Sequence, residues 1–268
     1  MTGARRWALA GFLAGALLAV AVWAPATWLA SAVNSASDGR LLLAEARGTV
    51  WNGSAVVVLT GGQDSRDASA LPGRLHWLMR PILHEGAGLA LHLDQACCLR
   101  DDATVFLKPG LGRTQLEIPA SKDWLAQVPT GWLAGLGTPW NTLELGGQLR
   151  LRSSGLKLET VAGRWRIAGS AAVELHALSS RLSTLPTLGS YRMDLRADPA
   201  NTSVPGAALQ LSTLEGALRL SAAGRWDGTG LRLRGDASAA TPADEAALGN
   251  LLNIIGRRRG AQSVISIG

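Results

Sequence analysis

Lysine is scarce in this sequence of 268 residues, and its scarcity excludes certain kinds of site. Only Lys108, Lys122 and Lys157 are present, and none follows the glycine spacing of a phosphate-binding loop. The net charge of +6 therefore rests on arginines, which alternate with apolar residues instead of clustering. Nucleic-acid grooves gather positive charge into patches, so this pattern favours solvated strand faces and no nucleic-acid partner.

Cysteine is equally rare. Cys97 and Cys98 are the only two, and they are adjacent, which excludes a zinc cluster or an ordinary disulfide framework. Three states stay open: a vicinal disulfide, a pairing between chains, or two reduced cysteines with a structural role. The sequence favours the last interpretation.

Motifs that carry catalytic chemistry are also missing. Four Gly-x-Gly sequences lack the third glycine of a dinucleotide-binding turn, whose position is taken by Leu91, Gln115, Trp140 and Leu233. There is no Gly-x-Ser-x-Gly elbow, no His-Glu-x-x-His and no acidic cluster with metal-ligand spacing. The histidines are interpreted as surface or half-buried side chains: His76, His84, His92 and His176. We expect no catalytic residue, metal or cofactor, and therefore no enzyme.

A long apolar segment predicts a membrane anchor. Residues 7–24 include no charged or strongly polar side chain, and the apolar character continues to about Val33. An uninterrupted run of about 18 apolar residues predicts a transmembrane helix, whereas the apolar part of a cleaved signal has roughly 7 to 15. We therefore expect a transmembrane anchor over residues 7–30, after a tail at residues 1–6.

The flanks of this segment predict its orientation. Trp7 and Trp28 would stand about 30 Å apart in one continuous helix, near the two edges of the hydrocarbon. Arg5 and Arg6 precede the segment, and the positive-inside rule places them in the cytoplasm. The rest of the chain is then periplasmic and held at the inner membrane of a bacterium. A signal peptide cleaved after residues 24–26 (APA) stays open as the alternative.

After Ser35 the sequence changes to an alternation of apolar residues with small or polar ones. A period of two is typical of strands that have one buried and one solvated face. Residues 36–268 are therefore predicted to form a mainly β domain with one or two short helices. Its fold would be a large antiparallel meander, curled into a groove-like or taco-like sheet. The broad apolar face must be covered by the curl itself, by helices, by lipid or by a partner.

Residues 48–58 contain the clearest turn signal. Asn52 and Gly53 stand between two β-prone runs, and both residue types tolerate positive φ, so this pair predicts a tight hairpin. Residues 163–173 and 224–234 repeat the order of glycine, tryptophan, turn and alternating strand. The irregular spacing favours a long meander of similar hairpins over a formal repeat.

Two helices are predicted inside the β domain. Residues 120–128 would form a short helix capped by Ser121, and Thr241 with Pro242 and Asp244 would begin a longer one. The apolar stripe of the longer helix consists of Leu248, Leu251, Leu252 and Ile255. Gly256 is expected to end it in the left-handed conformation. The arginines at 257–259 would then oppose the negative end of the helix dipole, or contact an acidic partner or lipid head groups.

Three motifs stand out along the chain: residues 48–54 (GTVWNGS), 137–140 (GTPW) and 251–258 (LLNIIGRR). Together with the basic start and the apolar anchor, they resemble the protein N (GspN) family of bacterial type II secretion systems. The resemblance implies a bitopic inner-membrane protein with a scaffolding or assembly role in the export of folded proteins. The implied partners are the inner-membrane platform and the outer-membrane secretin. The candidate structural or partner-contact residues are Trp51, Asn52, Gly53, Trp140, Leu251, Leu252, Ile255, Arg257 and Arg258.

A second resemblance concerns architecture alone. Long meanders of amphipathic strands behind a single anchor are similar to the groove-shaped lipid-transfer proteins of the bacterial envelope. In such a protein the apolar face of the sheet would hold acyl chains. Membrane lipid is therefore the other expected partner, and envelope lipid binding or transfer is the alternative function.

Overall fold

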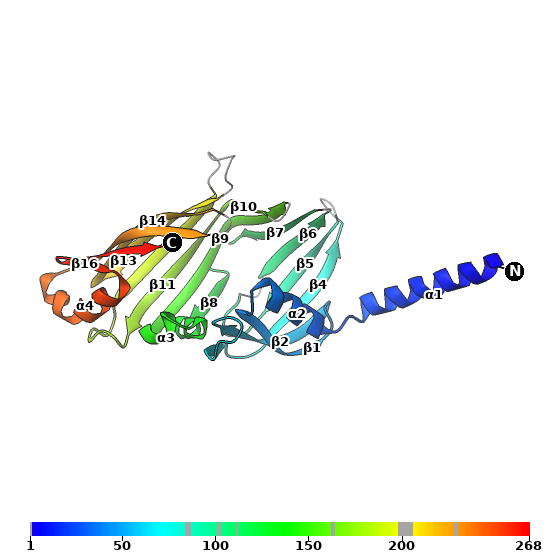
Figure 1. Ribbon diagram of the computed structural model, residues 1–268, viewed down its shortest axis with the longest axis horizontal. Coiled ribbons are helices and arrows are strands. Elements are labelled where there is room, and N and C mark those ends of the chain that lie inside the picture. Colours follow the sequence, from blue (N-terminus) through cyan, green and yellow to red (C-terminus); the bar gives the residue numbers. More distant parts are fainter. Residues whose placement is uncertain are drawn as a thin grey trace.

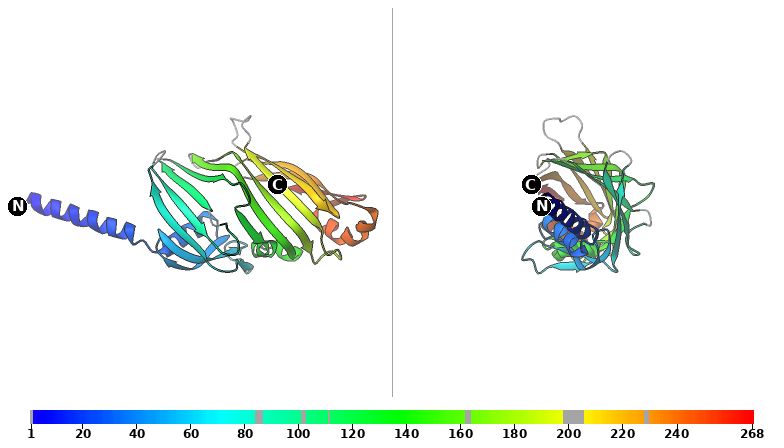
Figure 2. Two further views of the ribbon diagram at one scale, coloured as in Figure 1. Left: turned by 180° about the vertical axis from the view of Figure 1, so that it is seen from behind. Right: turned by 90° about the vertical axis from the view of Figure 1, so that its right-hand side faces the viewer.

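The computed structural model describes residues 2–83, 87–100, 103–110, 112–161, 164–197, 206–227 and 230–268. An extended helix precedes a long, mainly β body (Figure 1). All strand pairings between described residues are antiparallel, and viewed end on the strands follow a curve (Figure 2). The large antiparallel sheet predicted from the sequence is therefore confirmed.

The apolar segment folds as two helices instead of one. α1 spans Thr2–Val22 and α2 spans Ala26–Ala36. Pro25 lies between them, and a proline both lacks an N–H and disfavours a helical residue before it. The prediction of one continuous helix over residues 7–30 is therefore wrong, and Trp28 lies on the second helix. Within the described chain, no helix is long and apolar enough to cross a membrane.

The first half of the sheet follows α2. Its strands are β1 (Leu41–Gly48), β2 (Asn52–Thr60), β3 (Ala68–Ala70), β4 (Leu75–Ile82), β5 (Gly88–Asp94), β6 (Thr104–Gly110) and β7 (Arg113–Ala120). β2 pairs with β1 on one side and with β3 and β4 on the other. From β4 to β7 each strand pairs with the next, as a meander requires.

β9 (Leu145–Val161) joins the two halves of the sheet. Its last residues pair with β7 and β10 (Arg164–Ala168), and its first residues pair with β8 (Ala126–Pro129) and β11 (Ser170–Ser180). The change of partners falls at Gly155, where φ is +89°. Gly169, between β10 and β11, has φ of +81°, and a Cβ there would collide with the carbonyl oxygen of Gly155. Glycine at both positions therefore lets the two halves meet.

The second half of the sheet continues from β11. Its further strands are β12 (Gly189–Ala197), β13 (Ala207–Gly216), β14 (Leu218–Trp226), β15 (Leu231–Ala239), β16 (Arg257–Arg259) and β17 (Gln262–Ile267). Each of β11 to β15 pairs with the next, then β15 pairs with β17 and β17 with β16.

The helices pack on one face of the sheet, which we call the inner face. α2, the 3₁₀ helix η1 (Thr130–Leu136), α3 (Trp140–Leu143) and α4 (Pro242–Ile255) lie along the lower edge in Figure 1. Ala26 of α2 packs with Trp77, and Leu248 of α4 packs with Tyr191 and Leu218. These contacts cover the inner face along the edge where the helices lie.

The helix predicted over residues 120–128 is wrong. Residues 126–129 form β8, and the segment before it also bonds to β9. The amide of Ser121 donates to the carbonyl of Ser153 at 2.8 Å, and that of Leu125 donates to Leu151 at 2.7 Å. Because β9 already satisfies these backbone groups, the segment does not form a helix despite its helix-like sequence. The predicted start of α4 is confirmed, with Thr241 Oγ1 accepting from the amide of Asp244.

Candidate functional site

The loop between β1 and β2 holds the link between α1 and α2. Trp51 Nε1 donates to the carbonyl oxygen of Ala21 at 2.7 Å, and the amide of Val50 donates to Ala24 O at 2.9 Å. On the other side of the loop, Trp77 Nε1 donates to Val50 O at 3.0 Å. We call these residues, Ala21, Ala24, Val50, Trp51 and Trp77, the helix clamp. It is the contact through which the sheet holds α1.

The predicted hairpin exists, but its loop begins earlier than expected. β1 ends at Gly48, which has φ of +89°, and β2 already begins at Asn52. Asn52 and Gly53 are therefore strand residues, paired with Leu78 and Trp77 of β4. Gly53 is needed for a close approach, since a Cβ there would lie 2.5 Å from the Trp77 ring. The Asn-Gly pair correctly predicts a hairpin, but its position in the turn is wrong.

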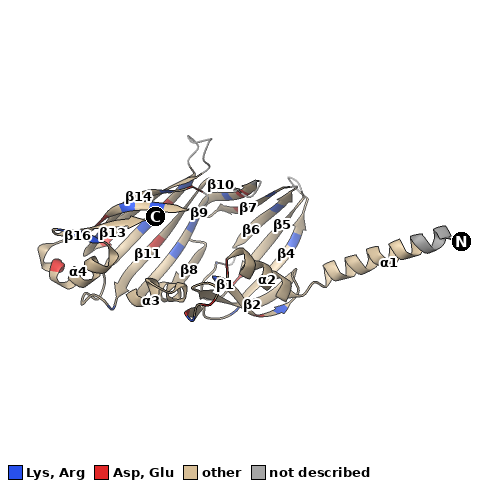
Figure 3. Ribbon diagram, viewed as in Figure 1, with Lys and Arg blue, Asp and Glu red and all other residues tan. Residues whose placement is uncertain are grey.

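Burial changes sharply at the helix clamp. Ala24 and Trp77 are only 7% and 3% exposed, whereas Trp7 and Trp23 are 81% and 76% exposed. Every described side chain of α1 is exposed, and none of them is charged (Figure 3). The clamp therefore fixes one end of an apolar helix that no other described part of the chain covers.

The apolar site residues predicted near the end of the chain lie in the core or against it. Leu251 and Leu252 are buried in the core under α4, and Ile255 packs against that core. Gly256 is extended, with φ of −169°, so the expected left-handed helix stop is wrong. Pairing with β17 imposes this extended conformation, and the three arginines form strand β16 instead of capping the helix.

The arginines of β16 differ in their surroundings. Arg257 is exposed, whereas Arg258 is half-buried and its Nη2 donates to Glu245 Oε1 at 3.1 Å. This ion pair joins β16 to the first turn of α4. Trp140, which begins α3, is 37% exposed, and the neighbouring Asn141 donates to Asp67 Oδ2 at 3.2 Å. The predicted site residues therefore lie in separate regions: the helix clamp, α3, and α4 with β16.

Cys97 and Cys98 form a vicinal disulfide, so the favoured interpretation of two reduced cysteines is wrong. They lie in the turn after β5, where Cys98 is buried against Val57 and Val128 while Cys97 is exposed. The amide of Gln127 in β8 donates to Cys98 O at 2.8 Å. This turn therefore ties the first half of the sheet to a strand of the second.

A network of charges lies on the outer face of β9, β11 and β12. Glu174 is buried, and its carboxylate contacts His176 at 2.9 Å, Arg192 at 3.3 Å and Arg152 at 3.5 Å. A hydrogen bond to Asp194 raises the pKa of Arg192. These groups pair with one another across neighbouring strands, which stabilises the outer face.

The other titratable groups do not gather into a site. His76 and His92 are exposed, and His84 lies outside the described residues. Burial raises the pKa of the Tyr191 hydroxyl, which donates to Leu218 O at 3.0 Å within the core. In the part of the chain that the structure describes, no three His, Cys, Asp or Glu side chains could hold a metal ion.

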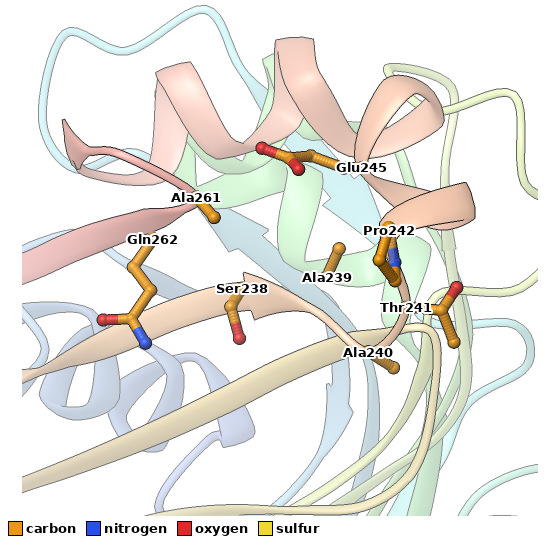
Figure 4. A pocket seen from close by; sticks show the side chains of 8 residues that line it. All are labelled: Ser238, Ala239, Ala240, Thr241, Pro242, Glu245, Ala261 and Gln262. Carbon is orange, nitrogen blue, oxygen red and sulfur yellow. The ribbon is translucent and has the colours of Figure 1, made fainter.

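A hollow of about 260 Å³ lies at the start of α4 (Figure 4). Its lining consists of Ser238, Ala239, Ala240, Thr241, Pro242, Glu245, Ala261 and Gln262. Glu245 supplies the charge in this lining, and its carboxylate is already paired with Arg258. The hydroxyl of Thr241 is also engaged, because it accepts from the amide of Asp244 at the start of α4.

A curled antiparallel sheet that holds one end of an exposed apolar helix defines a mainly β protein with a helical extension. The chain belongs to the family of type II secretion system (T2SS) protein N, whose model matches residues 39–267. The match includes the loop of the helix clamp, α4 and all of β17. This family consists of secretion components and is not a known enzyme family. Neither a comparison with curated proteins nor one with solved structures found a match.

Proposed function

We propose that the chain is a non-enzymatic component of a type II secretion system with a scaffolding or assembly role. Such a system exports folded proteins from the periplasm across the outer membrane. Membership of the protein N family is the observation that carries this proposal. The architecture supports it, because a large sheet that holds a helix at one end offers surface for other secretion proteins. The proposed partners are the inner-membrane platform and the outer-membrane secretin.

We also propose that the apolar segment within residues 7–30 anchors the protein in the inner membrane, with residues 1–6 in the cytoplasm and residues 36–268 in the periplasm. The exposed, uncharged side chains of α1 support this placement, since water is a poor solvent for them. The uncharged residues 7–22 of α1 rise only about 24 Å, against about 30 Å of hydrocarbon. Local thinning of the bilayer accommodates a mismatch of this size.

Secretion by a deletion strain tests the scaffolding role. Without the gene, a folded substrate should accumulate in the periplasm, and the full-length chain supplied from a plasmid should restore its export. Multimer formation by the secretin should be measured in the same cells. Normal export together with normal secretin multimers would contradict the proposal.

Membrane extraction tests the anchor separately. Leu17→Arg should release the protein from membranes washed at alkaline pH, because a charge in the hydrocarbon costs about 3 kcal/mol. Leu214→Arg is the matched control, since Leu214 on β13 is 48% exposed and lies outside the proposed anchor. Retention of the Leu17→Arg protein in the washed membranes would contradict the anchor.

Lipid binding is a second candidate function, favoured by the chemistry of the inner face. On β14, Leu218, Leu220 and Ala222 face inward, whereas the alternating Arg219 and Arg225 face outward. Described helices cover only part of this apolar face. Native mass spectrometry of the full-length protein in mild detergent tests the candidate, because a bound phospholipid adds its own mass. A protein that carries no lipid would count against lipid binding and would leave the secretion role untouched.

A further inference from the structure

Five neighbouring strands each place one apolar side chain in a single row across the inner face. The row consists of Leu89 on β5, Leu107 on β6, Leu116 on β7, Leu158 on β9 and Ile167 on β10. Each member is the direct cross-strand partner of the next. Leu91 and Leu93, on the same face of β5 as Leu89, pack with Trp77 under α2, which identifies this face as the inner one. We call these five residues the leucine row.

The leucine row lies outside the core clusters that the described residues form. All five side chains are half-buried, and none belongs to any of the four core clusters among the described residues. The second half of the sheet has a similar row, but there Leu209 and Leu233 are only 8% and 7% exposed because Trp226 packs with them. β6, β7 and β10 are labelled in the upper part of Figure 1, above the helices, whereas β5 and β9 also extend toward the lower edge. An apolar occupant of the leucine row would therefore bury side-chain area that the described core clusters leave open.

The charges on these strands lie on the opposite face. Lys157 Nζ is 3.1 Å from Glu117 Oε1, and Lys108 Nζ is 4.0 Å from Glu117 Oε2. Glu117 and Lys157 are cross-strand partners one position away from Leu116 and Leu158, so they face outward. Among the described residues of these strands, the charged side chains one position away from the leucine row therefore face away from it.

The backbone hydrogen bonds of these strands also limit which kind of molecule can bind to the leucine row. β5, β6, β7 and the end of β9 are each paired on both sides, so their amide and carbonyl groups bond within the sheet. An extended peptide lying on this face would leave its own backbone groups without partners, which costs free energy. An acyl chain has no such groups. With strands about 4.8 Å apart, the row is about 19 Å long, and the hydrocarbon of one leaflet is about 15 Å deep.

We propose that the leucine row binds an acyl chain of a membrane phospholipid, which lies across the five strands. This inference rests on the second candidate function, lipid binding, and names its site and ligand class. β5 is separated from β2, which follows the clamp loop, only by β4. The proposed anchor therefore keeps the near end of the row close to the membrane from which a lipid would enter.

Site-specific crosslinking tests the location. A photo-crosslinking amino acid replaces Leu116 or Leu158 in the full-length chain, and Gln115 or Glu159 in the matched controls. Gln115 and Glu159 are also cross-strand partners on the same two strands, but on the outer face. Irradiation of intact cells should give phospholipid adducts by mass spectrometry at the inner pair and not at the outer pair. Equal labelling of both pairs, no lipid adduct, or a peptide adduct at Leu116 would overturn the proposal.

A charge variant provides an independent test. Leu116→Glu should remove the co-purifying phospholipid, whereas Gln115→Glu places the same charge on the outer face and should retain it. Both variants are compared by thermal unfolding, and Leu116→Met provides a folded apolar replacement if Leu116→Glu unfolds. Retained lipid in folded Leu116→Glu, or lost lipid in folded Leu116→Met, would contradict an acyl site here. Because lipid is measured by mass and secretion by exported substrate, the lipid proposal and the secretion role can fail independently.

Discussion

Trp51 Nε1 donates a hydrogen bond of 2.7 Å to the carbonyl oxygen of Ala21, thirty residues earlier in the chain. Ala21 is in the last turn of α1, where carbonyl groups have no partner inside the helix. Trp51 supplies that partner from the β1–β2 loop, while Trp77 holds the loop from the other side. The indole of Trp51 therefore connects the last turn of the apolar helix to the sheet.

Replacing Trp51 by phenylalanine should loosen this connection without unfolding the sheet. Trp51→Phe keeps an aromatic ring but removes the N–H, which costs about 1 kcal/mol, or roughly fivefold faster local opening. Hydrogen exchange should show this increase at the amides of Val50 and Trp28, with little change in the unfolding of the β domain. Trp140→Phe is the control, because Trp140 is partly exposed on α3. Unchanged exchange at Val50 would show that the indole contact does not hold the helix.

Gly53→Ala should destabilise the helix clamp by steric overlap. A Cβ at Gly53 would lie 2.5 Å from the Trp77 ring and 2.7 Å from Arg47 O, and overpacking of this kind costs about 1 to 3 kcal/mol. Gly249→Ala is the opposite case, because Gly249 is inside α4 with open space around it. Alanine there should stabilise the protein by about 0.5 to 1 kcal/mol. Denaturant unfolding measures the free energy of unfolding of both variants. An equal change in the two would contradict the close approach of Gly53 to Trp77.

The apolar stripe of α4 should act through folding stability. Leu252→Ala removes a fully buried side chain, and such cavities cost about 2 to 5 kcal/mol. Ile254→Ala changes a side chain that is 51% exposed on the same helix, so its effect should be within about 0.5 kcal/mol. If Leu252→Ala unfolds like the natural chain but loses a secretion partner in crosslinking, Leu252 has a contact role that its burial does not predict.

The stability of the protein should fall above about pH 10 through Tyr191, the only tyrosine in the chain. Burial raises the pKa of Tyr191 in the folded protein. The contribution of Tyr191 to the free energy of unfolding is therefore fully present below about pH 10, its pKa in the unfolded chain. That contribution is lost as the pH rises beyond this value. Denaturant unfolding at increasing pH measures the decline, and the absorbance of tyrosinate reports this one residue.

Tyr191→Phe is the control for the alkaline transition. It should cost about 1 kcal/mol near neutral pH, because the carbonyl of Leu218 loses its donor. It should also make the stability less sensitive to pH in the alkaline range. An alkaline decline that is identical in Tyr191→Phe would assign the effect to other groups.

Local features of the fold were predictable where neighbouring residues decide them. The alternation of apolar and polar side chains predicts strands, and the Thr241–Pro242 start of α4 is a property of adjacent residues. Pro25 is also a local signal, and it divides the apolar segment where one continuous helix was expected. Residues 120–128 show the opposite case, since pairing with β9 overrides their helix-like sequence. Trp51 and Gly53 were found as candidates by their motif, whereas Trp77 gave no signal of its role before the strands were paired.

The sequence by itself determined that this is a mainly β protein with an apolar helix, similar to secretion protein N, because periodicity and composition act within single segments. Only the tertiary structure decided which segments meet. The helix clamp joins residues 21–24, 50–51 and 77, and the leucine row needs the register of five strands. A shift of one residue in any of these strands would move its side chain to the outer face. Both surfaces depend on long-range pairing, which no single segment encodes.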